Sequence, residues 1–428
     1  MTASCVSGLI FLITFLAIMT DVVHRTIAAW VGAAVMVGAG LLIGFYTHGQ
    51  ALQSIDFNTL ALLLGMMILM AMLSKTGVFE YLALLAAQQA HGSPWRLLVL
   101  LGTLTAVISM FLNNMTVIIL IAPVTLLVAG KLRMNPIPLL IAEAVLSNVG
   151  GTATLIGDPP NTLIASAARF SFNDFLIILL PIVVVAFYPT LLTFRHAFPK
   201  PARSADAGAY VASLPETETI KDPILLRKLL IVLFFILLLF VLQDMMPLLP
   251  GYVAFAGAGM ALLWLKPDPE EVLKEVEWSA LLFFASLFIV VGGLEAAGVM
   301  KAVASVVLSF AGSHVLLSAV LLIWIAAILS AVVDNIPFVI AMIPIIKSLD
   351  TEGLTVEPLW WALALGAGFG GSGTPIGASA NIMAISFSER AGHPISFRLW
   401  VRSGLLATLV SCGVGTLAFL VVFGIIKH

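Results

Sequence analysis

The sequence predicts an all-α polytopic membrane protein built from two inverted repeats, and three observations point to this fold class. Of the 428 residues, 61% are hydrophobic and only 10% are charged, whereas soluble domains carry about 25% charged residues. The apolar residues gather in runs of about 20, the length at which a helix crosses a bilayer. The two halves of the chain also match each other, residue by residue, at a nearly constant offset.

Each predicted repeat contains five spans, one of which is a discontinuous helix, and one re-entrant hairpin. The first repeat covers residues 1–198, the second covers residues 225–428, and a polar, cytoplasmic linker at 199–224 joins them. In chain order, the first hairpin, the first broken helix, the second hairpin and the second broken helix are expected at 97–130, 138–168, 316–349 and 359–389.

The remaining apolar runs are expected to be uninterrupted spans. They cover Cys5–Thr20, Thr26–Phe45, Thr59–Leu73, Asn173–Phe194, Leu225–Leu242, Gly251–Leu265, Ser279–Gly293 and Val401–Ile426. A short amphipathic helix is expected at Val78–Ala90, and its counterpart in the second repeat is expected after Gly298.

Polar and glycine residues recur between the halves, which indicates a duplicated unit. At an offset of 221, Ser109 matches Ser330 and the pair Asn113-Asn114 matches Asp334-Asn335. At an offset of 220, the matches are Gly150-Gly151 with Gly370-Gly371, Ile156-Gly157 with Ile376-Gly377, and Asn161 with Asn381. Because each unit has an odd number of spans, the two copies must cross the membrane in opposite directions.

The distribution of basic residues predicts the orientation of the chain. With the linker in the cytoplasm, sixteen of the 20 Lys and Arg residues lie inside, Arg25 among them, and four lie outside. Membrane proteins carry an excess of positive charge on their cytoplasmic side. The protein is therefore expected in the cell inner membrane, with both termini external.

Two stretches interrupt apolar helix with residues that break the backbone ladder. Glu143–Ala165 holds adjacent glycines and adjacent prolines, and Gly366–Asn381 holds a run of glycines. At membrane depth such breaks are tolerated only inside protein or beside a water-filled cavity. We therefore predict that the two breaks and the two hairpin tips form one transport site near the middle of the membrane.

The four converging elements offer mostly neutral hydrogen-bonding side chains, which suit a small hydroxylated or ionic solute that must bind weakly enough to leave. The candidate solute-binding residues are Asn113, Asn114, Thr116, Ser147, Asn148, Thr152, Thr154, Asn161, Asn335, Ser372, Thr374, Ser379 and Asn381. Glu143 lies in an apolar context and is a further candidate for the cavity wall.

Two acidic residues break the symmetry between the halves and are the candidates for coupling to protons or ions, with Asp334 as the first candidate and Asp158 as the second. Asp334 stands where the first half has Asn113, and Asp158 stands where the second half has Ala378. A carboxylate at membrane depth is costly and usually serves protons or cations. For Asp158 a second interpretation stays open, because an acid before Pro159-Pro160 is also typical of a helix cap.

The sequence indicates neither an enzyme nor a bound cofactor. Cys5 and Cys412 are the only cysteines, which excludes a disulfide framework and a cysteine-based metal cage. Gly368, Gly370 and Gly373 spell GxGxxG, but no strand precedes them, so no dinucleotide site is expected. Walker loops, metalloprotease helices and GxSxG elbows are absent. We therefore expect no catalytic residue, no metal, no cofactor and no nucleic-acid partner.

Three motifs resemble the ion transporter superfamily. They are SNVGGTATLIGDPPN (Ser147–Asn161), DNIPFVIAMIPIIKSL (Asp334–Leu349) and GASANIMAISFSERAGHPISF (Gly377–Phe397). The resemblance is to the branch that contains ArsB-type arsenite permeases, NhaD-type sodium/proton antiporters and the melanosomal P protein, and it covers nearly the whole chain. It implies an inverted-repeat fold with a scaffold part and a transport part, often as a homodimer. The length and the number of spans are most similar to an ArsB-type permease.

The leading hypothesis for function is a proton-coupled secondary transporter that expels arsenite or antimonite by alternating access. These solutes are neutral hydroxides at neutral pH, so a pocket of Asn, Ser and Thr suits them, while Asp334 and Asp158 would carry the coupling proton. A sodium/proton antiporter and a carrier of organic anions, such as dicarboxylates or citrate, stay open as alternatives. An ATP-driven mode would need a separate ATPase subunit, because the chain has no nucleotide site.

Overall fold

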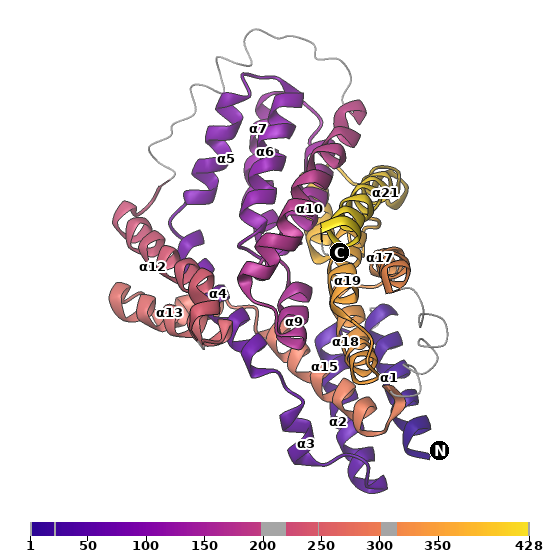
Figure 1. Ribbon diagram of the computed structural model, residues 1–428. Coiled ribbons are helices and arrows are strands. Elements are labelled where there is room, and N and C mark those ends of the chain that lie inside the picture. The colour runs from indigo at the N-terminus through magenta and orange to yellow at the C-terminus, as the bar shows by residue number, and fades with distance from the viewer. Residues whose placement is uncertain (1, 21–22, 198–219, 247, 301–314, 427–428) are drawn as a thin grey trace.

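The structure is a computed structural model that describes residues 2–20, 23–197, 220–246, 248–300 and 315–426. Within these ranges every regular element is a helix (Figure 1). Nine of the described helices are long and apolar enough to cross a membrane. The predicted fold class, an all-α protein with many membrane spans, is therefore confirmed.

The first half follows the predicted order of spans, hairpin and broken helix. Its helices are α1 (Thr2–Thr20), α2 (Arg25–Ile43), α3 (His48–Gln53), α4 (Phe57–Ser74), α5 (Val78–Gln89), α6 (Pro94–Ser109), α7 (Asn114–Lys131), α8 (Ile137–Gly151), α9 (Pro159–Ala168), α10 (Phe172–Thr193) and the 3-10 helix η1 (Phe194–Ala197). Helices α6 and α7 are the arms of the hairpin, and α8 and α9 are the two parts of the broken helix. The short helix α3 was not predicted.

The second half repeats this order. Its described helices are α12 (Pro223–Val241), the 3-10 helix η2 (Leu242–Met245), α13 (Pro250–Leu265), α14 (Pro269–Lys274), α15 (Trp278–Ala296), α17 (Val315–Val332), α18 (Asn335–Thr351), α19 (Glu357–Gly370), α20 (Ser379–Arg390), α21 (Phe397–Val421) and the π-helix η3 (Val422–Ile426). Helices α17 and α18 form the second hairpin, and α19 and α20 the second broken helix. Two predicted segments lie largely outside the described residues. They are the linker, up to residue 219, and the short helix expected after Gly298, of which residues 301–314 are not described.

Length alone does not distinguish a hairpin arm from a membrane span. Helices α7 and α17 have 18 residues each and the composition of a membrane-crossing helix, although both belong to predicted hairpins. Helix α13, predicted as a full span, has only 16 residues, which correspond to about 24 Å of helix. The hydrocarbon core of a bilayer is about 30 Å thick, so α13 is short for a perpendicular span.

Polar residues at the ends of the spans determine where several helices begin. The Asp56 carboxylate accepts hydrogen bonds from the backbone N–H groups of Asn58 and Thr59 at the start of α4. Ser93 caps α6 directly before Pro94, and Ser171 and Asp174 form a capping box on α10. These contacts satisfy N–H groups that have no partner within the first turn of a helix.

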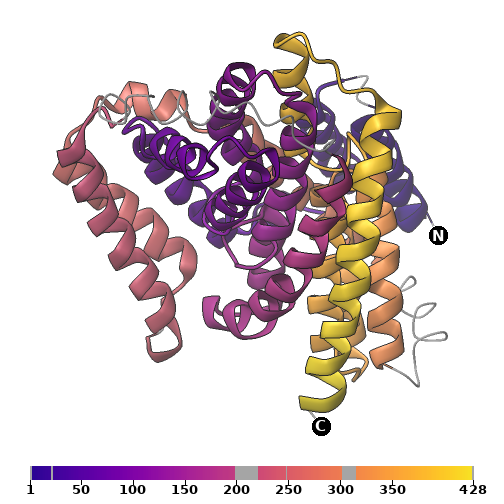
Figure 2. The same cartoon turned by 90° about the horizontal axis from the view of Figure 1, so that it is seen from above.

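The helices form three groups (Figure 1). Helices α12 and α13 pack together and α13 packs against α4, while α1 and α2 pack with α15. The two hairpins, the two broken helices, α10 and α21 form the third and largest group. Seen from above, α12 and α13 stand at the edge opposite to α21 (Figure 2).

The outer faces of α1 and α12 are strongly apolar. Ile13 on α1 is 58% exposed and Phe234 on α12 is 62% exposed, and both have apolar neighbours on the same helix that are also exposed. Soluble proteins rarely expose contiguous apolar surfaces of this kind. These faces therefore have the character of surfaces in contact with lipid.

Glycines allow two helix pairs of the central group to approach closely. A Cβ atom added at Gly150 of α8 would lie 2.3 Å from the carbonyl oxygen of Ala106 on α6. A Cβ atom added at Gly370 of α19 would lie 2.5 Å from the Cα atom of Ala327 on α17. Both contacts are far below van der Waals distance and involve backbone, so any larger residue would force the helices apart.

We expect Gly150→Ala to destabilise the protein by about 1–3 kcal/mol, the usual cost of overpacking. The matched control is Gly38→Ala, because nothing lies within 4 Å of a Cβ atom at that position in α2. Alanine is favoured over glycine in a helix interior by about 0.5–1 kcal/mol. Thermal unfolding in detergent should therefore show a lower midpoint for Gly150→Ala and an unchanged or higher one for Gly38→Ala; equal midpoints would contradict the close approach.

Candidate solute site at the helix breaks

The two hairpin tips and the two helix breaks meet in the middle of the central group. The tips are the turns between α6 and α7 and between α17 and α18, and the breaks cover residues 152–158 and 371–378. Helix α9 of the first half packs against α18 of the second, and α20 of the second half packs against α7 of the first. Each broken helix therefore reaches the hairpin of the other half, and the predicted convergence of the four elements is observed.

Asn148 is the centre of a hydrogen-bond network that joins three of these elements. Its Oδ1 atom accepts a hydrogen bond from Nδ2 of Asn114 at 3.3 Å. Its Nδ2 atom donates to Oδ1 of Asn381 at 3.1 Å and lies 3.3 Å from Oγ of Ser372. All four side chains are buried, so the network connects the first hairpin and both breaks inside the protein.

Asn161 and Asn381 hold the two breaks in the same way. Nδ2 of Asn161 donates to the carbonyl oxygens of Thr152 and Thr154 at 3.0 and 2.9 Å. Nδ2 of Asn381 donates to the carbonyl oxygens of Gly371 and Thr374 at 2.7 and 2.8 Å. Carbonyl groups in a helix break lack partners within the helix, and these amides supply partners from the following helix.

Most hydroxyl groups of the site connect a hairpin tip to a break by donating a hydrogen bond to a backbone carbonyl of the other element. Thr154 donates to the carbonyl of Met110, and Thr374 donates to that of Ala331. In the same pattern, Ser109 donates to the carbonyl of Ser147 at 2.8 Å, and Ser330 donates to that of Ala367 at 2.7 Å. These bonds recur between the halves at the offsets of 220 and 221 that relate the sequences.

Two of the predicted hydroxyls bond within their own helix. Oγ of Ser147 donates to the carbonyl of Ala144, and Oγ1 of Thr152 donates to that of Asn148, both at 2.8 Å. Such bonds leave the hydroxyl oxygen available as an acceptor only. The amides of the Asn residues are consequently the groups of the site with the largest donor capacity.

A small cavity lies between the hairpin tips and the breaks. Its volume is about 20 Å³, room for about one water molecule. Its polar walls are formed by Arg25, Asn113, Asn114, Asp158, Glu277, Asn335 and Ser379. A neighbouring cavity of about 40 Å³ shares Met67, Asn113 and Pro159 with it and also contacts Thr116. A solute of several heavy atoms would fit only if the tips moved apart.

The side chain of Asp158 faces this cavity. Its carboxylate accepts a hydrogen bond from Nδ2 of Asn335, at the tip of the second hairpin, at 3.1 Å. It makes no side-chain hydrogen bond to the first turn of α9, and the residue is 4% exposed. Asp158 therefore occupies the N-cap position of α9, but its side chain bridges the first break and the second hairpin and makes no cap bond.

Asp334 at the second tip forms an ion pair with Arg25, the first residue of α2. The other Asp334 oxygen accepts a hydrogen bond from the N–H of Ile336 at 3.3 Å, and the Arg25 guanidinium lies 5.6 Å from the centre of the Phe283 ring. At the first tip, Oγ1 of Thr116 lies 3.3 Å from Oε1 of Glu277, which precedes α15. Both hairpin tips are thus held by charged residues of the α2 and α15 group.

Arg25 and Glu277 line the small cavity but are not among the candidate residues that the sequence predicts. Arg25 was counted as a charge of a cytoplasmic loop, and in the structure it lines the cavity and pairs with Asp334. Glu277 has a sequence signal, because it stands 221 residues after Asp56, the cap of α4. Unlike Asp56, Glu277 makes no cap bond to its own helix. No such signal marks Arg25.

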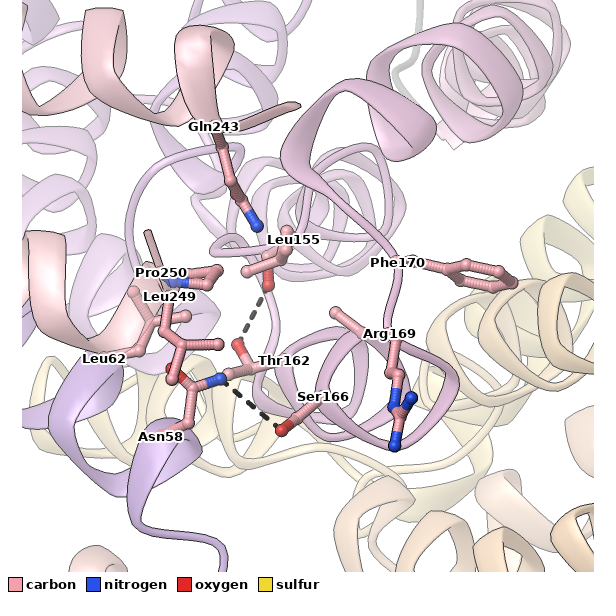
Figure 3. A pocket seen from close by; sticks show the side chains of 11 residues that line it. Asn58, Leu62, Leu155, Thr162, Ser166, Arg169, Phe170, Gln243, Leu249 and Pro250 are labelled. Atoms are coloured by element: carbon pink, nitrogen blue, oxygen red, sulfur yellow. Dashed lines mark hydrogen bonds between the residues drawn. The ribbon is translucent and has the colours of Figure 1, made fainter. Parts of the chain in front are cut away.

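A larger cavity lies beside the C-terminal part of α9 (Figure 3). Its volume is about 320 Å³, and Asn58, Thr162, Ser166, Arg169 and Gln243 contribute its polar groups. Figure 3 shows Gln243 pointing into this space, and Asn58 and Ser166 in contact across it at 3.5 Å. Helix α9 starts with Pro159 at the small cavity and ends beside the large one.

Comparison with known proteins gives family and fold. Residues 15–366 match the family described as "Citrate transporter". The chain is 42% identical to the "46 kDa membrane protein" of Mycobacterium leprae (strain TN), over 95% of this chain and 96% of that protein. It is 40% identical to a protein of Mycobacterium tuberculosis (strain ATCC 25618 / H37Rv) called an "Uncharacterized transporter", over 99% of this chain and 100% of that one.

Two further similarities bear on the resemblance expected from the motifs. The chain is 33% identical to the human P protein, over 94% of this chain and 58% of the P protein. The crystal structure of the Alcanivorax borkumensis YdaH transporter, described as having an unusual topology, is similar with a TM-score of 0.60 and 11% identity, over 99% of this chain and 98% of that one. The expected resemblance to the P protein branch is confirmed, and at this identity the YdaH similarity shows the fold alone.

Proposed function

The chain belongs to the citrate transporter family, and on that premise we propose that it is a proton-coupled secondary transporter that expels arsenite or antimonite by alternating access. The observation that supports this proposal most is the network centred on Asn148, because it places neutral amides and a hydroxyl at the meeting point of both breaks and a hairpin tip. Neutral hydroxides such as arsenite exchange hydrogen bonds with groups of this kind without needing a counter-charge.

The charges around the small cavity argue against a free polyanion as solute. Asp158 and Glu277 line the cavity and Asp334 lies beside it, while Arg25 is the cationic side chain in the wall and is already paired with Asp334. An anion carrying several charges would be repelled by these carboxylates at short distance in a medium of low dielectric constant. A neutral solute is not repelled, and a proton or cation is attracted.

Asp158 is the acid that we assign to the coupling proton, with Asp334 as the second candidate. A proton carrier must be stable with and without its proton. The carboxylate of Asp334 is already engaged in an ion pair with Arg25. Among the described residues, the hydrogen-bonding partner of the Asp158 side chain is the neutral amide of Asn335, so Asp158 can exchange a proton without breaking an ion pair.

For Asp158→Asn we expect loss of coupling with the site intact. The new amide retains an oxygen that can accept the bond from Asn335, but it cannot be protonated. In proteoliposomes with the membrane potential held at zero, the accumulation ratio of solute under a gradient of one pH unit should fall about tenfold for each proton no longer coupled. Solute exchange at equal pH should persist. Asp174→Asn, in the capping box of α10, should leave both quantities unchanged.

Alternating access would follow from the arrangement of the helices. In this proposal residues 1–198 and 225–428 are the inverted repeats, the linker at 199–224 is cytoplasmic, and both termini are external in the inner membrane. The hairpins and broken helices, with α10 and α21, move against a scaffold made by the α2 and α15 group and the α4 and α13 group. The cavity of about 320 Å³ beside α9 serves as the approach to the site, and the functional unit is a homodimer.

A second candidate is a carrier of organic anions. The description of the family as "Citrate transporter" favours it, as does Arg169 in the wall of the large cavity. In this alternative the solute would reach the small cavity with its charge neutralised by bound protons or cations. A sodium/proton antiporter is the third candidate, and the carboxylates near the small cavity are the feature that favours it.

Transport by purified protein in sealed vesicles separates these candidates. Arsenite, antimonite, citrate and sodium are each presented with the same pH gradient and no ATP. We expect proton-driven accumulation of arsenite and antimonite. Accumulation of citrate alone would overturn the solute assignment, and sodium movement alone would indicate an antiporter. Transport that requires ATP and an added subunit would overturn the secondary mechanism.

A further inference from the structure

Glu143 is a buried acid in the transport group that the mechanism above does not use. It lies in the middle of α8, and only 1% of its surface is exposed. Oγ1 of Thr125 on α7 lies 2.6 Å from one carboxyl oxygen, Oε1. The other oxygen, Oε2, is buried and has no hydrogen-bond partner among the described residues. A carboxylate would leave a full charge with a single hydrogen bond.

In the part of the chain that the structure describes, no ion pair joins a cation to Glu143. The helices and the turn packed against α8 are α6, α7, α10, α19, α20, α21 and η1. Their exposed charged side chains are Arg96, Lys131, Arg195, Glu389, Arg390, Arg398 and Arg402. Asp174 and Glu357 lie in the first turns of α10 and α19, Tyr188 of α10 is exposed, and Cys412 of α21 is buried.

The described contacts of the Glu143 carboxyl group are the hydrogen bond with Thr125 at Oε1 and none at Oε2. An isolated charge is very costly in such surroundings, whereas a neutral carboxylic acid is tolerated. The arrangement seen in the structure therefore fits the protonated form of Glu143, and release of its proton would require access to water.

Packing does not require an acid at this position. Leu363 occupies the equivalent place in α19, 220 residues later, and its side chain is fully buried. Glu143 is also close to the site, because it precedes Asn148 by five residues, or about 7.5 Å of helix. Helices α7 and α8 are joined at one place by Asn114 and Asn148 and at another by Thr125 and Glu143. Separation of these helices at the site would therefore also expose Glu143.

We propose that Glu143 is a second proton-binding site of the transport cycle, an inference that rests on the proposed proton coupling. When the hairpin moves and water enters between α7 and α8, Oε2 loses its proton to water and the carboxylate is hydrated. When the hairpin opens to the other side of the membrane, Oε2 takes a proton from the water there, and closure of the helices then buries the neutral acid against Thr125. One proton crosses in each cycle at this residue, in addition to the proton carried at the site.

The test compares Glu143→Gln with wild type in proteoliposomes, with the membrane potential held at zero. Glutamine has the shape of the protonated acid and cannot release a proton. We expect solute exchange at equal pH to persist, and the accumulation ratio under a gradient of one pH unit to fall about tenfold, the factor for one proton. Glu143→Leu copies the residue of the second half and should behave like Glu143→Gln.

The outcomes distinguish this inference from the proposed function. If wild type accumulates solute under the pH gradient and Glu143→Gln accumulates it equally, Glu143 is a permanently protonated structural acid and the inference is wrong. If wild type itself does not respond to the gradient, the proton coupling fails, and the inference fails with it.

If Glu143→Gln folds poorly, infrared spectra of the wild-type protein decide the question. Removal of Oγ1 by Thr125→Val identifies the C=O band of protonated Glu143, because that band should shift. In the wild-type protein this band should lose intensity when the pH is raised during solute turnover. A band that does not change would overturn the inference.

Discussion

Asn148→Ala is expected to lower the rate of solute transport by at least about a hundredfold, because three buried groups lose their partner at once. The substitution removes the acceptor of the Asn114 amide and the donor to Asn381 and Ser372. Each buried polar group left without a partner costs about 1–3 kcal/mol. The first hairpin would then no longer be joined to the two breaks in the geometry that binds solute.

The control for this variant is Asn173→Ala. Asn173 also donates two hydrogen bonds, to the carbonyl of Val241 at 2.7 Å and to Asp244 at 2.6 Å, but it lies at the start of α10 away from the site. Initial rates in proteoliposomes, normalised to the amount of folded protein, should be near those of wild type for Asn173→Ala. Equal rates for the two variants would show that the network around Asn148 is not part of the solute path.

Arg25→Gln is expected to open the cavity on the side of α2, because it removes the ion pair that holds the second hairpin tip. The opening can be measured with a cysteine placed in the cavity wall by Ser379→Cys. The exposed Cys5 is replaced by Ser, and the native Cys412 can stay because it is buried. Hydrogen bonds to charged groups contribute about 1.5–3 kcal/mol. A water-soluble maleimide should therefore react about tenfold faster, or more, in the Arg25→Gln variant.

Two further variants decide whether the ion pair itself is responsible. Exchanging the charges, with Arg25→Asp and Asp334→Arg together, should restore slow labelling if the pair holds the tip. Lys75→Gln breaks a different pair, 3.0 Å between Nζ of Lys75 and Glu271, outside the cavity wall, and should leave the labelling rate unchanged. Slow labelling in Arg25→Gln itself would contradict the role assigned to the pair.

The helices were predictable from the sequence because their signals are local. Apolar runs of about 20 residues fix the spans to within a few residues, and adjacent Gly150-Gly151 and Pro159-Pro160 fix the first break, since neither pair continues a helix without cost. Helices α3 and α14 were missed because each has only six residues. Segments of that length carry no hydrophobic period that distinguishes a helix from a loop.

The site was predictable in its components and less so in its contacts. Repetition of Asn114 as Asn335 and of Asn161 as Asn381 identified the residues that meet at the tips and breaks. The bond between Asp158 and Asn335 joins residues 177 positions apart, and the Arg25 to Asp334 pair joins residues 309 positions apart. Contacts over such distances depend on tertiary packing, and Arg25 alone looked like a loop charge.

The most direct test of the central claim is equilibrium binding of arsenite, antimonite, citrate and sodium to the purified protein and to its Asn381→Ala variant. Oδ1 of Asn381 accepts the hydrogen bond from Asn148, and its Nδ2 donates to two backbone carbonyls of the second break. The account predicts that arsenite and antimonite bind the wild-type protein and that the substitution weakens this binding at least about tenfold. Binding of citrate without arsenite, or arsenite binding of equal strength in both proteins, would contradict it.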